Sequence, residues 1–243
     1  MARSTPSRLL RVDLGARTCE SERVPVEWRR RFVGGKGLGA RYLYEELGAD
    51  TDPLGPDNAL LFMGGPLTGY LPGEQRFAAI TKSPLTGTFL DSYAGGAFPG
   101  TLAGALDDHL GVLVTGAAAD PVTLVVQDGS ARIETAGELW GGDTRETADA
   151  FPDAAVACIG PAGEHRVRYA TIATDGGDHH AGRGGAGAVM GSKKLKAVVA
   201  RGEPPTGLAD RRRAAADRFA ADAVGRWQAA SETLESAEFA DAV

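Results

Sequence analysis

The sequence predicts an α+β fold. Short strand-like runs and helical segments follow one another without the regular strand–helix–strand alternation of a parallel α/β sheet. The clearest local signal is a hairpin, in which Val122–Gln127 and Ala131–Glu134 flank an Asp128-Gly129 turn. Glycine supplies 34 of the 243 residues, twice the ~7% of an average protein, and shows no collagen-like period. We therefore expect mixed or antiparallel sheets with short helices, joined at many places by glycine turns.

The N-terminal part of the chain predicts a hairpin that leads through a loop into a helix. Leu9–Leu14 and Cys19–Val24 are typical of two strands joined by a turn. Val26–Phe32 is expected to connect this hairpin to the glycine cluster Gly34–Gly39, at which a helix opens. Apolar residues four positions apart continue that helix as far as Gly48, which occupies the position expected for a helix end.

Beyond Gly48 the sequence alternates between strands, turns and short helices. The tetrapeptide Pro-Leu-Thr-Gly occurs twice, at residues 66–69 and 84–87, and both copies are predicted turns. The helix predicted at Gly95–Asp107 is expected to be interrupted by Pro99. The other predicted elements are strands at Ala59–Met63, Arg76–Thr81, Thr88–Asp91, Val112–Thr115, Ala155–Ile159, Val167–Thr174 and Lys196–Ala200, a helix at Thr144–Phe151, and a glycine-rich loop at Gly176–Gly187 followed by a short helix.

A domain boundary is predicted after Gly202, where the composition changes and Pro-Pro-Thr-Gly follows at residues 204–207. We expect residues 1–203 to form one domain, and residues 204–243 to form a linker and the first helix of a truncated α-helical domain. The apolar face of that helix consists of Phe219, Ala223, Trp227, Ala230 and Leu234. This face either packs back on the first domain or requires a partner, which would be a C-terminal partner chain or a second copy.

Composition and charge exclude several classes of protein. The formal net charge is −6, so neither nucleic acid nor an anionic membrane is an expected partner. No segment approaches the roughly 20 apolar residues of a membrane helix, and residues 1–11 contain no apolar signal region, so we expect a cytoplasmic protein. Cys19 and Cys158 lie far apart and form no disulfide, zinc or iron–sulfur motif. Each cysteine is interpreted as a small buried apolar residue.

Two glycine clusters are candidate anion sites. Gly34–Gly39 contains Lys36, Gly182–Gly187 contains Arg183, and each cluster opens a helix. Backbone N–H groups without neighbouring Cβ atoms, at a helix N-terminus and beside a cation, suit a phosphate. Two such clusters favour a large ligand with several phosphates. The alternative for each cluster is a tight turn where two backbones cross closely.

Other residues are candidates for binding or for chemistry. Arg76 stands at the start of a predicted strand, from which its guanidinium could bind a phosphate in a bidentate manner. The alternative is a solvated arginine at the end of a strand. Gly182–Gly187 also has the G-x-G-x-x-G spacing of dinucleotide-binding loops with Glu203 about twenty residues on, but residues 175–181 separate it from its predicted strand. His179 and His180 are interpreted as solvated loop side chains, because neighbours in an extended segment point in opposite directions. No Ser/His/Asp or Cys/His arrangement indicates a protein nucleophile.

A series of motifs in a fixed order carries a family resemblance. These motifs are Gly34-Gly35-Lys36-Gly37-Leu38-Gly39, Gly65-Pro66-Leu67-Thr68-Gly69, Arg76-Phe77, Thr81-Lys82-Ser83-Pro84-Leu85-Thr86-Gly87, Gly95-Gly96, Ile159-Gly160-Pro161-Ala162-Gly163-Glu164 and the unbroken run from Gly182 to Lys193. In this order they resemble the N-terminal domain of the aldehyde ferredoxin oxidoreductases, from about Leu9 to Gly202.

The resemblance implies a tungsten or molybdenum enzyme that oxidises aldehydes to carboxylic acids and passes electrons through a [4Fe–4S] cluster to ferredoxin. The domain would be a mixed α+β base for a bis-pterin cofactor, whose dithiolenes hold the metal and whose phosphates are bridged by magnesium. Main-chain carbonyls near Tyr93 and Ala181 would be available to magnesium, and the metal centre rather than a protein side chain would be catalytic. The residues implied to contact pterin or phosphate are Arg76, Tyr93, Ala94, Gly95, Gly96, Ala181, Gly182, Arg183, Gly184 and Gly185.

The sequence also departs from the family pattern. Tyr93-Ala94-Gly95-Gly96 stands where relatives commonly have Asn-Ser-Gly-Gly, and Pro99–His109 replaces an expected helix and Ala-Gly-Tyr-Asp turn. The cluster cysteines and proton-handling side chains of the longer relatives are absent from these 243 residues, so we expect this chain alone to be incompetent for turnover. The alternative function is a non-catalytic truncated remnant, or a cofactor-binding subunit that completes its site with a second polypeptide.

Overall fold

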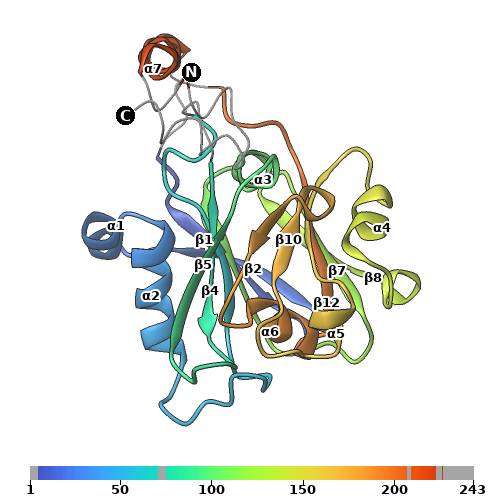
Figure 1. Ribbon diagram of the computed structural model, residues 1–243. Coiled ribbons are helices and arrows are strands. Elements are labelled where there is room, and N and C mark those ends of the chain that lie inside the picture. The colour runs from blue at the N-terminus through green and yellow to red at the C-terminus, as the bar shows by residue number, and fades with distance from the viewer. Residues whose placement is uncertain (1–4, 71–74, 207–208, 223–225, 227–243) are drawn as a thin grey trace, which may run out of the picture.

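The computed structural model describes residues 5–70, 75–206, 209–222 and 226. In this part the chain builds two six-stranded sheets that lie beside each other, as Figure 1 shows. In spatial order the first sheet consists of β2 (Thr18–Arg23), β1 (Arg8–Asp13), β6 (His109–Thr115), β3 (Leu60–Met63), β4 (Phe77–Lys82) and β5 (Phe89–Ala94). The second consists of β11 (His179–Ala181), β10 (Ile172–Thr174), β9 (Ala155–Cys158), β12 (Leu195–Arg201), β7 (Val122–Gln127) and β8 (Ser130–Thr135).

Both sheets are mixed. β1 pairs with β6 in parallel, and β7 pairs with β12 in parallel, whereas the other pairings among the described strands are antiparallel. The helices are short and irregularly placed between the strands, so the expected α+β class is confirmed. They are α1 (Val26–Phe32), α2 (Gly35–Glu46), α3 (Phe98–Ala105), α4 (Thr144–Asp149), α5 (Pro161–Glu164), α6 (Ala186–Ser192) and α7 (Ala209–Ala221), with 3₁₀ turns η1 (Gly137–Leu139) and η2 (Asp175–Gly177).

Strand alternation explains how the core is divided. In β3, Leu60 and Phe62 belong to the cluster shared by the two sheets, whereas Leu61 and Met63 belong to the cluster under α2. Successive strand side chains point to opposite faces, so a strand with every position buried needs cover on both faces. The first sheet is covered by α1 and α2 on its outer face, and the outer face of the second sheet packs against the segment around Phe151.

Four local expectations were wrong. Val26–Phe32, expected as a loop, is helix α1, and Glu27 in its first turn with arginines in its last turn suits the helix dipole. Pro99 does not interrupt α3 but lies in its first turn, where backbone N–H groups have no intrahelical acceptor and proline is tolerated. The expected loop Gly176–Gly187 contains strand β11, and the expected strand Val167–Thr174 is strand only from Ile172.

The C-terminal segment leaves the second sheet across α3. Gly104 lets the backbone of Glu203 approach that helix, since a Cβ at Gly104 would overlap the Glu203 carbonyl, and Gly100 faces Pro204. Helix α7 then stands apart from both sheets (Figure 1). Of the apolar face predicted for this segment, Phe219 lies in α7 and is partly exposed. Ala223, Trp227, Ala230 and Leu234 lie outside the described residues.

Candidate functional site

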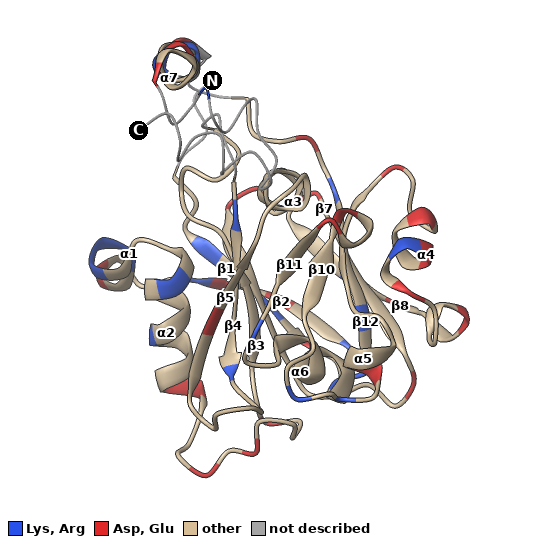
Figure 2. Ribbon diagram, viewed as in Figure 1, with Lys and Arg blue, Asp and Glu red and all other residues tan. Residues whose placement is uncertain are grey.

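Two edge strands from different sheets meet at the centre of the molecule. β5 ends the first sheet and β11 ends the second, and they run next to each other, as Figure 2 shows. We call this line of contact the seam and define it by residues 89–96 on one side and 179–185 on the other. The seam is not a strand pair, because β5 and β11 belong to different sheets and share no backbone ladder. Side chains and glycine turns therefore make the contact.

The structure brings the implied cofactor-binding residues to this seam. The β5 side of the seam ends with Tyr93, Ala94, Gly95 and Gly96. The β11 side ends with Ala181, Gly182, Arg183, Gly184 and Gly185. Arg76 directly precedes β4, whose first residue Phe77 pairs with Ala94, so Arg76 lies at the same end of the sheet. Arg76, Tyr93 and Arg183 are exposed, whereas Ala94, Gly95, Ala181, Gly184 and Gly185 are buried.

Three hydroxyl groups join the two sides of the seam. Ser83 Oγ donates to the carbonyl of Gly184 at 2.6 Å, and Ser92 Oγ donates to the carbonyl of Gly182 at 2.6 Å. In the opposite direction, Thr174 Oγ1, at the end of β10, donates to the carbonyl of Gly95 at 3.1 Å. Ser83, Ser92 and Thr174 are all buried. Each hydroxyl thus comes from a strand of one sheet or the turn after it, and donates to a glycine carbonyl in the turn after the edge strand of the other sheet.

Glycine is required here by close approach and by backbone conformation. Gly96 has φ +81°, and a Cβ there would overlap a carboxylate oxygen of Asp175. That same oxygen accepts the N–H of Ala97 at 2.9 Å, just before α3. Gly185 has φ +84°, and a Cβ there would overlap the carbonyl oxygen of Arg168. The turn Gly95–Gly96 is therefore held against the Asp175 side chain, and the turn Gly182–Gly185 against the Arg168 backbone.

The first glycine cluster serves the packing of α2. The N–H of Gly35 donates to the carbonyl of Gly64 at 2.8 Å, and a Cβ at Gly39 would overlap Ile80 of β4. Lys36 pairs with Asp91 of β5, with Nζ and Oδ1 3.1 Å apart. The structure thus supports the tight-turn interpretation for Gly34–Gly39, and the anion interpretation stays with Gly182–Gly187.

A polar chain lies on the face of β5 that turns away from Ser92. Tyr93 donates its hydroxyl to Asp91 Oδ2 at 2.7 Å, and Asp91 also pairs with Lys36. Burial, and then the hydrogen bond to Asp91, raises the pKa of Tyr93 to about 12. The tyrosine hydroxyl is therefore a donor with a committed acceptor, and its ring remains partly exposed beside Gly95.

Sequence reasoning missed several residues that lie in the seam or bond to it. Ser83, Ser92, Thr174 and Asp175 were given no role, although Ser83 lies within one of the quoted motifs and begins a serine turn that accepts the N–H groups of Leu85 and Thr86. The others carry no local signal, since their partners lie about eighty or ninety residues away in sequence.

The dinucleotide interpretation conflicts with the topology. Contrary to expectation, strand β11 directly precedes Gly182. It is antiparallel to β10, and the order β11-β10-β9-β12 separates it from β12, the strand that follows α6. A dinucleotide loop needs a parallel strand–helix–strand unit, which this arrangement does not provide.

The histidines and cysteines behave as structural residues. His179 and His180 point in opposite directions, since His179 faces Asp175 and His180 Nδ1 lies 2.9 Å from Thr171 Oγ1. Within the described ranges, no group of three His, Cys, Asp or Glu residues is placed to hold a metal ion. Cys158 is buried, and burial raises its pKa to about 12, whereas Cys19 is half-buried against the core.

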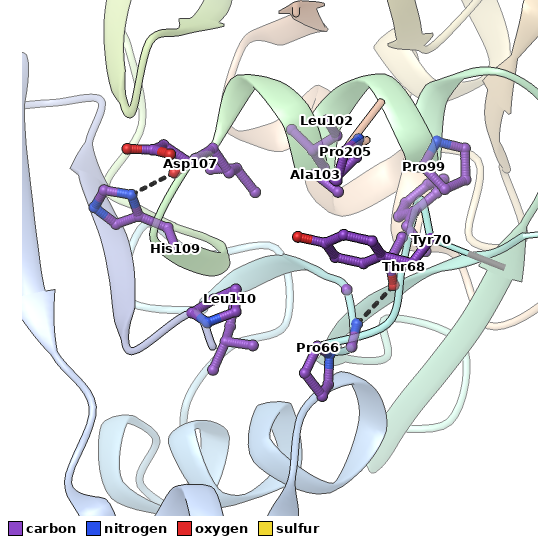
Figure 3. Close-up of a pocket in the computed structure, with 15 residues that line it drawn as sticks. Pro66, Thr68, Tyr70, Pro99, Leu102, Ala103, Asp107, His109, Leu110 and Pro205 are labelled. Carbon is purple, nitrogen blue, oxygen red and sulfur yellow. Dashed lines mark hydrogen bonds between the residues drawn. The ribbon is translucent and has the colours of Figure 1, made fainter. Parts of the chain in front are cut away.

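A separate pocket lies beside α3, away from the seam. Figure 3 shows Tyr70, Leu102, Leu110 and Pro205 around it, with His109 at one end. His109 Nδ1 lies 2.7 Å from the carbonyl of Leu106, so this nitrogen carries the proton and donates. None of the ten implied cofactor-binding residues lines this pocket.

Comparisons with known proteins agree with this fold. The family described as "Aldehyde ferredoxin oxidoreductase, N-terminal domain" matches residues 9–202. A tungsten-containing aldehyde ferredoxin oxidoreductase of Pyrococcus abyssi (strain GE5 / Orsay) is 39% identical over 84% of this chain and 34% of its own length. The WOR-like subunit of an aliphatic sulfonate oxidoreductase of Pyrococcus furiosus is 36% identical over 82% of this chain and 34% of its own.

A solved structure also has a chain that is similar to this one in fold and in sequence. The active-site complex BamBC of benzoyl coenzyme A reductase, in complex with 1,5-dienoyl-CoA, contains a chain with a TM-score of 0.78 and 34% identity, over 84% of this chain and 32% of that chain. The two-sheet fold with its glycine seam is thus an N-terminal domain found among oxidoreductases. The chain belongs to the aldehyde ferredoxin oxidoreductase family. It spans about a third of the length of the relatives it matches.

None of the helices in the described part of the chain is both long and apolar enough to cross a bilayer.

Proposed function

We propose that this chain is the cofactor-binding base of an oxidoreductase that oxidises aldehydes to carboxylates at a bis-pterin tungsten or molybdenum centre and passes the electrons to ferredoxin. The observation that carries the proposal is the seam, where glycine turns from two sheets meet beside Arg183, with Arg76 at the same end of the first sheet. The tungsten in the names of matched relatives supports the choice of cofactor.

The seam fits the phosphates of such a cofactor. Within the described part of the chain, the backbone N–H groups of Gly96 and Arg183 have no acceptor. Arg183 is an exposed residue and Gly96 is partly exposed, which supports access of a ligand to both turns. Backbone donors beside a guanidinium form strong, charge-assisted hydrogen bonds to phosphate. Arg76 and Arg183 would neutralise the phosphates, and the seam would orient the pterins.

When bound, the cofactor supplies the metal on which the two-electron oxidation takes place. Magnesium binds oxygen ligands, and main-chain carbonyls near Tyr93 and Ala181 are the ones we propose for it. Cys19 and Cys158 are too few for a [4Fe–4S] cluster with four thiolate ligands, so we propose that its ligands come from outside these residues.

A domain division accompanies this proposal. Residues 1–203 would form the cofactor-binding domain, and residues 204–243 a linker and the beginning of an α-helical region. A second candidate is a cofactor-binding subunit that completes its site with another polypeptide. The relatives named as a WOR-like subunit and as part of a BamBC complex favour this candidate.

Metal and pterin analysis tests the proposal. The chain is purified from a host supplied with tungstate and molybdate, and we expect tungsten or molybdenum with about two pterins per metal, as a bis-pterin centre requires. Arg183→Ala and Arg76→Ala should retain less than about one tenth of this content, because each loses charge-assisted bonds to phosphate. Arg30→Ala, an exposed arginine on α1, is the control and should retain all of it.

Two outcomes would count against the proposal. A folded chain that carries neither metal nor pterin, alone or co-expressed with the polypeptide encoded next to it, would contradict cofactor binding. Equal loss of cofactor in the Arg30 variant would show that the arginines act through general charge rather than at the seam. Aldehyde-dependent reduction of ferredoxin, measured on the loaded protein or complex, then separates aldehyde oxidation from another reaction at the same centre.

A further inference from the structure

We propose that Ser83, Ser92 and Thr174 are positioning residues: their hydroxyls fix the glycine peptides of the seam so that the N–H groups of Gly96 and Arg183 face an anionic ligand. The inference rests on the proposed function for the identity of that ligand, a pterin phosphate. It concerns three buried side chains whose hydroxyls bond glycine carbonyls of the seam.

The first step is the reciprocity of the three bonds. Ser83 and Ser92 reach from the first sheet to Gly184 and Gly182 of the second. Thr174 reaches from the second sheet to Gly95 of the first. A carbonyl buried at this contact needs a donor, and without these hydroxyls the glycine turns would have to rotate to find one. Each turn is therefore held by the opposite sheet.

The second step follows from the planarity of the peptide group. In a trans peptide the C=O of one residue and the N–H of the next point in opposite directions. Since the Gly95 carbonyl points to Thr174, the N–H of Gly96 points away from it. By the same geometry, the Gly182 carbonyl points to Ser92 and directs the N–H of Arg183 the other way. These are the two donors that have no acceptor within the described residues.

The third bond acts on the shape of the turn. The Gly184 carbonyl points to Ser83, and the N–H of the following Gly185 is already bonded to the carbonyl of Arg183 at 2.9 Å. Arg183, Gly184 and Gly185 have φ values of +62°, +66° and +84°, a left-handed conformation that is costly for Arg183. Ser83 thus holds the turn that carries the Arg183 donor.

The test compares variants that differ in a hydroxyl group. Thr174→Val keeps the shape of the side chain and removes the hydroxyl, whereas Thr174→Ser keeps the hydroxyl. Ser92→Ala and Ser83→Ala remove the other two. Thr147→Val is the matched control, because Thr147 is a buried threonine of α4 whose hydroxyl donates to the carbonyl of Asp143 at 2.7 Å, away from the seam.

Two readouts are measured on the full chain. The first is the Kd for inorganic pyrophosphate, obtained from the NMR shifts of the Gly96 and Arg183 amides in protein without cofactor. The second is the pterin content after expression in a cofactor-replete host. We expect pyrophosphate to shift both amides of the wild type. Thr174→Val and Ser92→Ala should weaken binding roughly tenfold, the effect of one lost hydrogen bond, with Thr174→Ser and Thr147→Val close to wild type.

The outcomes separate this inference from the proposed function. The inference would be overturned, and the proposed function would stand, if the wild type contained pterin but pyrophosphate did not shift the two amides. The same holds if the wild type contained pterin and the variants bound pyrophosphate as tightly as the wild type. A wild type without pterin, whose pyrophosphate binding still depends on the three hydroxyls, would support the positioning role and contradict the proposed cofactor. If Thr174→Val fails to fold by circular dichroism, the two serine variants decide the question.

Discussion

The ammonium nitrogen of Lys196 lies 2.5 Å from a carboxylate oxygen of Glu164, in a place where the two side chains are 0% and 3% exposed. Lys196 Nζ also donates to the carbonyl of Gly142 at 2.7 Å, and the second Glu164 oxygen accepts the N–H of Gly141 at 2.8 Å. The pair joins β12, α5 and the segment before α4. Each charged group has hydrogen-bond partners, as burial of ionised groups requires.

Removing one member of this pair should be strongly destabilising. Lys196→Met leaves the Glu164 carboxylate buried without its cation, and we expect a loss of about 3–5 kcal/mol in the free energy of unfolding. Urea denaturation followed by circular dichroism measures it. The control is Arg132→Met, which breaks the exposed pair with Glu134 and should cost less than about 1 kcal/mol. Similar losses in the two variants would show that burial does not govern the Lys196 pair.

Lys193 should make stability depend on pH in the alkaline range. Its ammonium donates to the carbonyls of Pro56 and Gly116 at 3.1 and 3.0 Å. Burial lowers its pKa to about 8, against the opposing effect of Asp13 and Asp57. Between about pH 8 and its ordinary pKa near 10.4, the unfolded state therefore binds more protons than the folded state, and stability rises with pH.

This rise is measured as the difference in unfolding free energy between wild type and Lys193→Met at several pH values. Because a change of one in pKa corresponds to about 1.4 kcal/mol, the difference should grow by at most about 3 kcal/mol across this window. The neutral amine still donates to both carbonyls, so the contact survives deprotonation. Lys36→Met, at an exposed lysine, is the control. A difference that stays constant or falls with pH would refute the prediction.

Gly185 should tolerate alanine less well than Gly87. Both have positive φ values, +84° and +73°, but a Cβ at Gly87 meets nothing within 4 Å, whereas one at Gly185 would overlap the Arg168 carbonyl. We expect Gly87→Ala to cost about 1–2 kcal/mol from its conformation alone. Gly185→Ala adds overpacking of about 1–3 kcal/mol. The measurement is thermal and urea unfolding of the two variants. Equal losses of unfolding free energy would show that the Arg168 carbonyl does not approach Gly185 closely.

Asp91 should control the titration of Tyr93. Burial and the hydrogen bond to Asp91 raise the pKa of Tyr93 to about 12. Asp91→Asn removes the negative charge, so the pKa should fall toward the ordinary value near 10, while burial retains part of the rise. The ultraviolet absorbance of tyrosinate, taken as the difference from a Tyr93→Phe protein, follows this residue alone. An unchanged titration would show that the carboxylate is not its acceptor.

The local sequence pattern was sufficient to predict most strands, but it was insufficient where contacts with other elements determine the structure. The alternating or continuous apolar runs at β1, β3, β7 and β12 predicted strands within one or two residues of their observed bounds. Helix α1 was missed because its seven residues are mostly charged and show no long apolar period. Its Trp28 ring meets Tyr42 of α2 edge to face, with centroids 5.3 Å apart. That contact, rather than a local signal, stabilises the helix.

The sequence by itself determined the α+β class, the glycine turns and the ordered motifs that identify the family, because these depend on short-range backbone preferences and on residue identity. Only the tertiary structure decided which glycines serve packing and which open a site. Gly35 gives its N–H to Gly64, whereas the N–H groups of Gly96 and Arg183 have no acceptor within the described residues. The difference is set by contacts such as Ser92 with Gly182, ninety residues apart. Such contacts exist only once two sheets have packed, and no local preference encodes them.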